Sequence, residues 1–243
     1  LFESILRINF MVMNSQKFNF FLSKLSNKPL PVLDTNNTLD KFIEIDLSVK
    51  NKELLNFDTS SSKEWENYIT SYLKRRNSAI AFGGYLEKRN LYDRSDYFKN
   101  SIENEQRNIH LGIDLWCVAN TKVLAVLDGV VHSFKNNNNY GDYGPTIILK
   151  HTFIGQEFYT LYGHLSMCSI DKLTIGKEIL QGDIIGYLGD SKVNGDYAAH
   201  LHFQIIRDIA QNFGDYPGVS SKKNIEKFKM NCPDPNLLLK LKN

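Results

Sequence analysis

The chain has 243 residues, which is enough for one large domain or for one domain with an extension. Hydrophobic residues (42%) and charged residues (23%) are close to the average of folded globular proteins, and this excludes a disordered chain, a collagen-like repeat and a coiled coil. The 29 Lys and Arg residues nearly balance the 27 Asp and Glu residues, so that the net charge is +2. Because no basic stripe stands out, we expect no nucleic-acid partner.

Neither a membrane span nor an export signal is predicted. No stretch reaches the roughly 18 apolar residues that a transmembrane helix needs. Residues 1–14 contain Arg7 as their only positive charge, and the apolar run at 8–13 is too short for a signal peptide. The three cysteines form no CxxC pair and fit reduced thiols. These features predict a cytoplasmic protein.

The first third of the chain mixes helix and strand. Residues 14–25 and 63–76 are predicted helices, and a serine cluster before the second one offers an N-cap. Residues 42–47 alternate between apolar and polar side chains and predict a strand. We assign residues 1–79 to an N-terminal extension of mixed helix and strand.

Residues 80–212 show short alternating apolar runs separated by glycine and asparagine, which is typical of an antiparallel sheet. The predicted strands are 109–115, 123–127, 130–134, 146–151, 157–162, 184–188 and 201–206. Asp128-Gly129 lies between two of them and indicates a two-residue hairpin turn with positive φ at both positions. We expect a mainly β domain, built as two antiparallel sheets or a partly rolled sheet with peripheral α-helices.

Residues 213–243 are punctuated by three prolines and predict a C-terminal tail that packs on this domain. A short helix is expected near residues 221–230.

One strand carries a polar face that packing alone would not require. Strand alternation puts His110, Gly112 and Asp114 on one face, while Leu111, Ile113 and Leu115 lie on the other. The glycine has no side chain and leaves room for an ion between the imidazole and the carboxylate. A lone HxxxD pattern is common, so this feature needs support from elsewhere in the chain.

Further histidines supply that support. His200 and His202 share a strand face, about 7 Å apart along the strand, and His164 ends another strand beside a glycine. Any one of them is explained as a hydrogen-bonded histidine at a strand end. Three groups suited to zinc, together with two spare imidazoles, make that explanation weaker and predict a metal site.

The motifs HLGID (110–114), YGHL (162–165) and HLHF (200–203), in this order, resemble the lysostaphin-type (LytM-like) zinc metallopeptidases, which cut peptidoglycan cross-links. The resemblance covers about residues 80–212. It implies that His110, Asp114 and His202 hold one zinc ion per chain, and that His164 and His200 assist catalysis.

The segments FGGYLEKRNLY (82–92) and CPDPNLLL (232–239) are similar to a subgroup in which this peptidase domain is fused to class III aminotransferase-like and kinase-like modules. Neither of these modules is present in the sequence.

The implied activity is zinc-dependent endopeptidase hydrolysis of peptidoglycan cross-links or of a similar short peptide. Two imidazoles and one carboxylate leave one zinc position open for water, whose pKa the ion lowers. The sequence contains no HExxH motif, so the resemblance gives the role of base to His164 or His200 and leaves open which one acts. The alternative is a non-catalytic zinc-binding or regulatory module of the same fold.

The substrate contacts stay unassigned. The loops at 135–145 and 189–199 are expected to shape a groove, and Tyr85, Tyr143, Tyr162 and Tyr197 are candidate contacts among which the sequence does not choose. His132 and His151 are assigned structural roles. Cys117 is not a predicted metal ligand, because strand alternation puts it off the face that carries His110 and Asp114. The resemblance implies a periplasmic or extracellular location, against the cytoplasmic one that the missing signal suggests. The oligomeric state is open.

Overall fold

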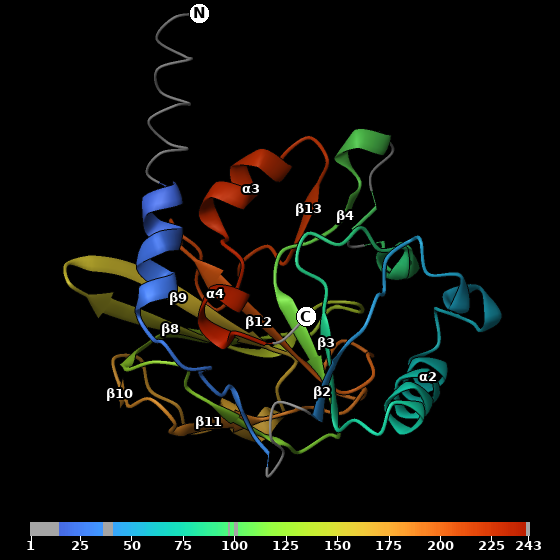
Figure 1. The fold of residues 1–243 in the computed structure, drawn as a ribbon, viewed down its shortest axis with the longest axis horizontal. Helices are drawn as coiled ribbons and strands as arrows, with labels where there is room; N and C mark the ends of the chain where they lie inside the picture. The colour runs from blue at the N-terminus through green and yellow to red at the C-terminus, as the bar shows by residue number, and fades with distance from the viewer. Residues whose placement is uncertain (1–14, 36–40, 97, 100–101, 242–243) are drawn as a thin grey trace, which may run out of the picture.

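The computed structural model describes residues 15–35, 41–96, 98–99 and 102–241. Its largest element is an eight-stranded sheet with the strand order β10-β7-β8-β9-β12-β5-β3-β2 (Figure 1). These strands are β2 (Phe42–Glu44), β3 (Ile80–Gly83), β5 (Ile113–Trp116), β7 (Gly129–Asn137), β8 (Gly144–Phe153), β9 (Gln156–Gly163), β10 (Glu178–Ile179) and β12 (His200–Ile206). All neighbouring strands in this sheet are antiparallel except β2 and β3, which are parallel. The prediction of a mainly antiparallel β protein is confirmed.

Two smaller sheets complete the scaffold. A three-stranded sheet has the order β1-β6-β11, and a two-stranded sheet joins β4 to β13. The bounds are β1 (Leu33–Asp34), β4 (Arg107–His110), β6 (Lys122–Leu124), β11 (Ile184–Tyr187) and β13 (Val219–Ser221). Val123 and Ile185 of the three-stranded sheet share the largest buried cluster with Phe203 and Ile205 of β12. The main core therefore lies between these two sheets, because alternate residues of β12 point into it.

The helices lie at the periphery, as expected. Residues 15–24 are helical and stand beside β8 and β9 on one side of the molecule, whereas α2 (Ser62–Arg75) lies on the opposite side, near β2 and β3 (Figure 1). Ser61 caps α2 by accepting a hydrogen bond from the Glu64 backbone N–H, as the serine cluster predicted. The C-terminal helices are α3 (Ile225–Asn231) and α4 (Asn236–Leu239). The helix predicted near 221–230 thus begins later, because Val219–Ser221 form β13 instead.

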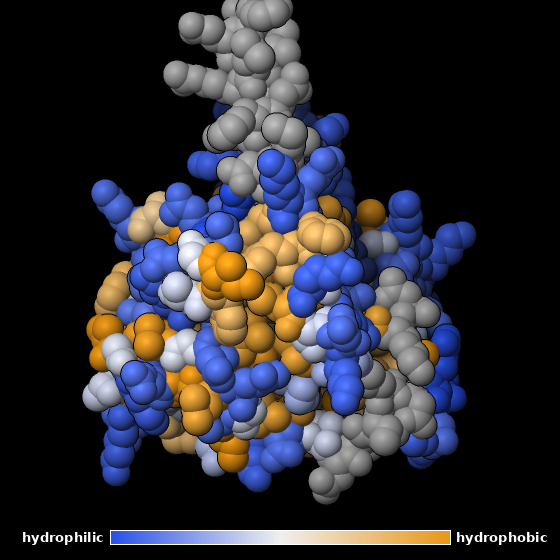
Figure 2. Space-filling model, turned by 60° about the vertical axis from the view of Figure 1, so that its left-hand side comes forward, coloured by the Kyte–Doolittle hydropathy of each residue, from blue (hydrophilic) through white to orange (hydrophobic). Residues whose placement is uncertain are grey.

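The end of the molecule that carries β8 and β9 has apolar side chains at its surface (Figure 2). Figure 2 brings this side forward and shows hydrophobic side chains gathered below the N-terminal helix. The helix covers part of this end, since Phe18 packs edge-on against Phe158 with ring centroids 5.9 Å apart. Within the described residues, no helix is both long and apolar enough to cross a membrane.

The predicted Asp128-Gly129 hairpin is wrong. The strands on its two sides belong to different sheets, since β6 pairs with β1 and β11 while β7 pairs with β8 and β10. Gly129 is not among the glycines with positive φ. A Cβ atom at Gly129 would lie 2.5 Å from the Lys150 carbonyl oxygen and 2.8 Å from His151 Nδ1. The glycine therefore serves close packing rather than a tight turn.

The predicted strand at 109–115 is broken in two. β4 ends at His110 and β5 begins at Ile113, and the Leu111 N–H donates to the Gly218 carbonyl outside both strands. The break changes the partner of Leu111, which packs with Tyr143 and Ile206, whereas Ile113 and Leu115 join the main core. The expectation that the three apolar residues share one face is therefore wrong.

The region before residue 80 contributes to the same sheets. β2 extends the edge of the large sheet beside β3, and β1 pairs with β6. The Ile45 N–H donates to the Phe82 carbonyl at 2.9 Å, which continues this contact beyond β2. The division of the chain at residues 79 and 212 stays a prediction. Residue 14 of the first predicted helix lies outside the described residues, as does the stretch 1–13.

Candidate active site

The three residues expected to bind zinc meet in the structure. His110 ends β4, Asp114 lies in β5 and His202 lies in β12 directly opposite Asp114. The His110 Nε2 atom is 2.8 Å from His202 Nδ1, and each of these atoms is 3.2 Å from Asp114 Oδ1. All three side chains are buried, and they form a possible metal site.

The donor set and its spacing fit a divalent transition metal. A tetrahedral zinc ion with bonds of about 2.0–2.2 Å separates its ligand atoms by roughly 3.3–3.5 Å. The three donor atoms lie 2.8–3.2 Å apart, so that a small outward movement would make room for the ion. Two imidazoles and one carboxylate favour zinc over calcium or magnesium, which prefer oxygen ligands.

The protonation states also suit a metal. Burial lowers the pKa of His110 to about 3, so that this ring is neutral at pH 7. Burial opposes ionisation of Asp114, but the neighbouring His110 and Arg89 outweigh it and hold the pKa of this carboxyl well below its usual range. Ligands must be deprotonated to bind a metal, and both residues meet this condition.

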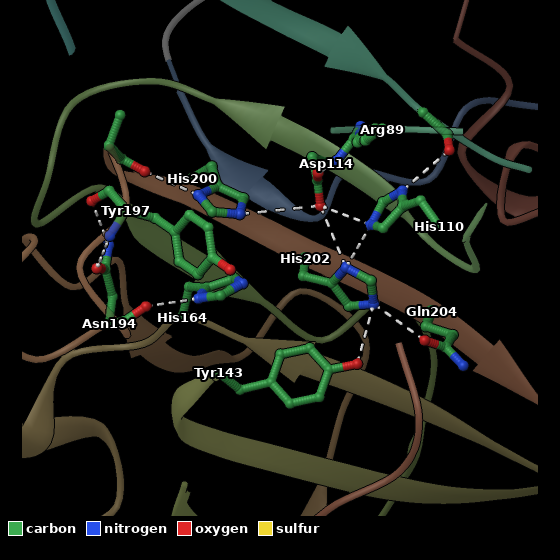
Figure 3. Close-up of polar contacts among 12 residues, drawn as sticks. Arg89, His110, Asp114, Tyr143, His164, Asn194, Tyr197, His200, His202 and Gln204 are labelled. Atoms are coloured by element: carbon green, nitrogen blue, oxygen red, sulfur yellow. Dashed lines mark hydrogen bonds and ion pairs between the residues drawn. The ribbon is translucent and has the colours of Figure 1, made fainter. Parts of the chain in front are cut away.

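Backbone and side-chain acceptors orient the two ligand imidazoles (Figure 3). His110 Nδ1 lies 2.9 Å from the Gly84 carbonyl, which can only accept, so that the proton is on Nδ1 and Nε2 is free. Gln204 donates through its Nε2 to the Pro217 carbonyl, which turns its Oε1 toward His202 Nε2 at 2.9 Å. His202 therefore carries its proton on Nε2 and presents the Nδ1 lone pair to the site.

The two expected catalytic histidines lie next to this cluster. Figure 3 shows His164 and His200 side by side, with ring centroids 4.2 Å apart. His200 Nδ1 donates to the Ala198 carbonyl and His164 Nδ1 donates to the Asn194 carbonyl, both at 2.8 Å. Each ring thus keeps a free Nε2, and that of His200 is 3.9 Å from Asp114 Oδ1.

Burial keeps these two rings neutral. It lowers the pKa of His200 to about 4, and burial together with the neighbouring histidines lowers the pKa of His164 well below its usual value. Trp116 stacks on His200 with ring centroids 4.0 Å apart and covers one of its faces. Both rings are therefore neutral at pH 7, with Nε2 unprotonated.

The backbone around His164 is strained and well held. His164 has φ +62°, a left-handed conformation that is uncommon for residues other than glycine and concentrates at functional sites. Its N–H donates to the Tyr143 carbonyl, and its own carbonyl accepts from the Gly189 N–H. Asn194 is fully buried and binds the Gly189 and Tyr197 carbonyls with its side chain. The 189–199 loop thus fixes the acceptor of His164.

A cavity of about 150 Å³ opens onto the five residues. Gly141, Asp142 and Tyr143 line it from the connection between β7 and β8, and Tyr197 lines it from the 189–199 loop. Both predicted loops therefore contribute to its wall. The Tyr197 hydroxyl donates to the Gly141 carbonyl at 2.7 Å and so ties the two loops together.

The remaining candidates lie elsewhere or have other partners. The Tyr143 hydroxyl donates to the Tyr216 carbonyl, so that it supports the wall of the cavity. Tyr85 donates to the Cys232 carbonyl, and the Tyr162 hydroxyl accepts from the Val126 N–H within the main core. Neither of these two tyrosines lines the cavity.

The other histidines have structural partners. His151 bonds to the Asp128 carbonyl and the Thr160 hydroxyl, and His132 bonds to the Ser133 hydroxyl. Cys117 contacts Thr121 and does not line the cavity.

Three residues of the site did not stand out in the sequence. Arg89 pairs with Asp114, Gln204 orients His202 and Asn194 orients His164. Gln204 follows His202 by two positions, so strand alternation could have placed it on the same face. Arg89 and Asn194 lie in irregular segments, where no periodic pattern indicates which way a side chain points.

Residues 108–213 match the model of a family described as Peptidase family M23. This segment contains all five residues of the site, and its match agrees with the predicted family of lysostaphin-type peptidases. The match supports the predicted family and, with it, the class of peptide-bond hydrolases. The narrower resemblance to aminotransferase-fused proteins stays a prediction. No curated protein matches the chain.

Several solved structures resemble the chain at low identity. The catalytic domain of the antimicrobial peptidase lysostaphin from Staphylococcus simulans is 21% identical, with a TM-score of 0.38, and the match covers 70% of this chain and 98% of that domain. A mutant catalytic domain of the prophage-encoded M23 protein EnpA from Enterococcus faecalis is 19% identical, with a TM-score of 0.36, covering 53% of this chain and 86% of that one. A zinc containing peptidase from Vibrio cholerae is 23% identical, with a TM-score of 0.32, covering 44% and 30%. At these TM-scores the likenesses support no conclusion about chemistry.

Proposed function

We propose that the chain is a zinc-dependent endopeptidase that hydrolyses peptide bonds of peptidoglycan cross-links or of a similar short peptide. One observation carries this proposal: three metal-donor atoms within 3.2 Å of one another share a cavity with two imidazoles that have a free Nε2. The family match supports peptide-bond hydrolysis. The peptidoglycan substrate rests on the resemblance of the sequence motifs.

His110, Asp114 and His202 would hold the zinc ion through Nε2, Oδ1 and Nδ1. When bound, zinc polarises the scissile carbonyl and lowers the pKa of a water molecule toward neutrality. The orientation of these three side chains does not depend on the ion, because Gly84, Arg89 and Gln204 already hold the atoms that face away from it. The site is therefore preorganised.

His164 and His200 would move the protons of the reaction. A neutral imidazole accepts a proton at Nε2 from the attacking water, whose oxygen bonds to the carbonyl carbon. The same ring, once protonated, donates this proton to the peptide nitrogen, which leaves as an amine when its bond to the carbonyl carbon breaks. Both rings have the required tautomer, since each donates its Nδ1 proton to a backbone carbonyl. Either ring can act as the base.

The test separates metal binding from catalysis. His164→Ala and His200→Ala should each keep about one zinc per chain, measured by elemental analysis, and should lower the rate of peptide release by roughly 10²–10⁴-fold. His110→Ala and Asp114→Ala should lose both the metal and the activity. The assay uses purified peptidoglycan and synthetic peptides that contain glycine or D-amino acids.

His132→Ala is the matched control, because this histidine lies outside the cavity and should leave both metal and activity unchanged. Zinc binding by the unaltered chain without hydrolysis of any of these substrates would contradict the peptidase proposal and favour a non-catalytic module of the same fold. A chain that binds no zinc would overturn the metal centre itself.

A further inference from the structure

Arg89 is the least expected residue at the metal site. Its side chain is only 2% exposed and lies between two carboxylates, Glu87 and Asp114. Arg89 Nε is 2.5 Å from Glu87 Oε2, and Arg89 Nη1 is 2.5 Å from Asp114 Oδ2. Arginine is almost never fully buried unless it is paired, and a buried ion pair is weak evidence for stability. We therefore asked what Arg89 does for Asp114.

The two oxygens of Asp114 have different partners. Oδ1 faces His110 Nε2 and His202 Nδ1, whereas Oδ2 accepts from Arg89 (Figure 3). If both oxygens were to bind one metal ion, Oδ2 would have to turn away from the guanidinium. That movement would leave a cation whose side chain is 2% exposed with one partner fewer, which is unfavourable.

Arg89 itself cannot easily follow such a movement. Its second partner, Glu87, accepts from the Leu47 N–H with its other oxygen, Oε1, at 2.9 Å. A Cβ atom at Gly84 would overlap Arg89 Nη2 and lie 2.9 Å from His110 Nδ1, so the chain packs closely against both residues at this point. The guanidinium is thus held from two sides.

We propose that Arg89 is a positioning residue that restricts Asp114 to coordination through one oxygen and thereby keeps the metal four-coordinate, with one open position. The inference rests on the proposed metal centre but not on the identity of the substrate. A two-oxygen Asp114 would add a fifth ligand atom beside the water that a catalytic site binds in its open position. Glu87 acts on Asp114 indirectly, because it holds Arg89 in place.

The test replaces zinc by Co²⁺, whose visible absorption reports its coordination number and does not depend on turnover. The unaltered protein should show the intense band of a four-coordinate ion. Arg89→Gln frees Oδ2, so the band should become several-fold weaker, as it does for a five-coordinate ion. Competition with a chromophoric chelator should show metal affinity reduced by about 10–100-fold. Arg89→Lys keeps a cation for Oδ2 and should restore the intense band.

Arg94→Gln is the matched control, because Arg94 also has a 2% exposed side chain in an ion pair, with Asp196, but contacts no ligand residue. Its cobalt band should equal that of the unaltered protein. If Arg89→Gln does not fold, Glu87→Gln/Arg89→Gln removes both buried charges together and still frees Oδ2, so it should show the same weak band.

An unchanged band and affinity in the folded Arg89→Gln variant, or in the double variant, would overturn the inference. A weakened band in Arg94→Gln would also overturn it, because the effect would then follow from loss of any buried ion pair. Failure of the unaltered protein to bind Co²⁺ would instead overturn the metal centre, and this inference with it.

Discussion

Each of the five site residues uses one polar atom to fix its own orientation and presents another to the cavity. The four histidines donate one ring proton to a carbonyl oxygen of Gly84, Ala198, Asn194 or Gln204. The Asp114 carboxylate gives one oxygen to Arg89 in the same way. Residue identity therefore supplies the chemistry, while the hydrogen-bond partner of each residue determines which atom faces the cavity.

Gly112 is the residue on which the packing of this cluster depends most directly. The HLGID motif suggested that this glycine leaves room for an ion, but the space is filled by the His202 ring. A Cβ atom at Gly112 would lie 2.7 Å from both His202 Cε1 and the Phe203 carbonyl oxygen. The backbone oxygen cannot move away easily, so the imidazole would be displaced from the site.

We expect Gly112→Ala to lower the free energy of unfolding by about 1–3 kcal/mol, as overpacking in a core does, and to weaken metal binding because His202 shifts. Urea unfolding of the metal-free protein and chelator competition measure the two effects. Gly176→Ala is the control, since a Cβ there meets nothing within 4 Å and only its φ of +79° resists the change. Metal affinity that stays the same in Gly112→Ala would contradict the role assigned to this contact.

At the scale of elements, the alternation of apolar and polar residues predicted the strands well, whereas the turn residues predicted the hairpin poorly. Seven of the eight predicted strands overlap a single observed strand, because the period of two in their side chains is visible in the sequence. The hairpin signal at Asp128-Gly129 failed, whereas Ile154-Gly155, between β8 and β9, forms a hairpin turn with two positive φ values, +50° and +73°. A β-branched residue in this conformation gave no turn signal.

Ile154 should therefore be a site of stabilisation. Its side chain is 92% exposed, so it contributes little burial, and its left-handed backbone is unfavourable for a β-branched residue. Ile154→Asn should raise the free energy of unfolding by about 1 kcal/mol, because asparagine tolerates this conformation and favours such hairpin turns. Chemical denaturation measures the change. Ile154→Val, which remains β-branched, should show no gain, and an equal gain in both variants would argue against backbone strain as the cause.

At the scale of the whole molecule, the fold buries neutral histidines. Burial lowers the pKa values of His110 to about 3 and of His151 and His200 to about 4, and it also lowers the pKa of His164 well below its usual value. In the unfolded chain these groups titrate near 6.5. Protons therefore bind the unfolded state more tightly than the folded state. The free energy of unfolding is unaffected by this difference above pH 6.5 and decreases as the pH falls toward 4.

The metal-free protein should accordingly lose stability when the pH falls from 7.5 to 5.5. Each of these histidines should contribute a loss of about 1.4 kcal/mol over this interval. Urea unfolding in the presence of a chelator at both pH values measures the total. His151→Gln removes one such group outside the metal site and should reduce the pH effect by about that amount. Equal stability of the unaltered protein at both pH values would contradict the burial of neutral imidazoles.

The sequence alone predicted the mainly β class, the positions of the strands and the residue types of the site. Strand periodicity and metal-ligand chemistry are local properties, and the order of the three histidine motifs was specific enough to predict the family. Even there, the strand break at Leu111 escaped prediction, because it depends on a hydrogen bond to Gly218 more than a hundred residues later.

Only the tertiary structure decided which atoms of the site meet. The pairing of Asp114 with Arg89, the turning of Gln204 by Pro217 and the fixing of His164 by Asn194 join segments that no periodic pattern connects. Their geometry follows from how the sheets and loops pack around a buried polar cluster, where each donor and acceptor must find a partner. A linear pattern predicts which groups are available, whereas the folded chain selects the orientation in which they act.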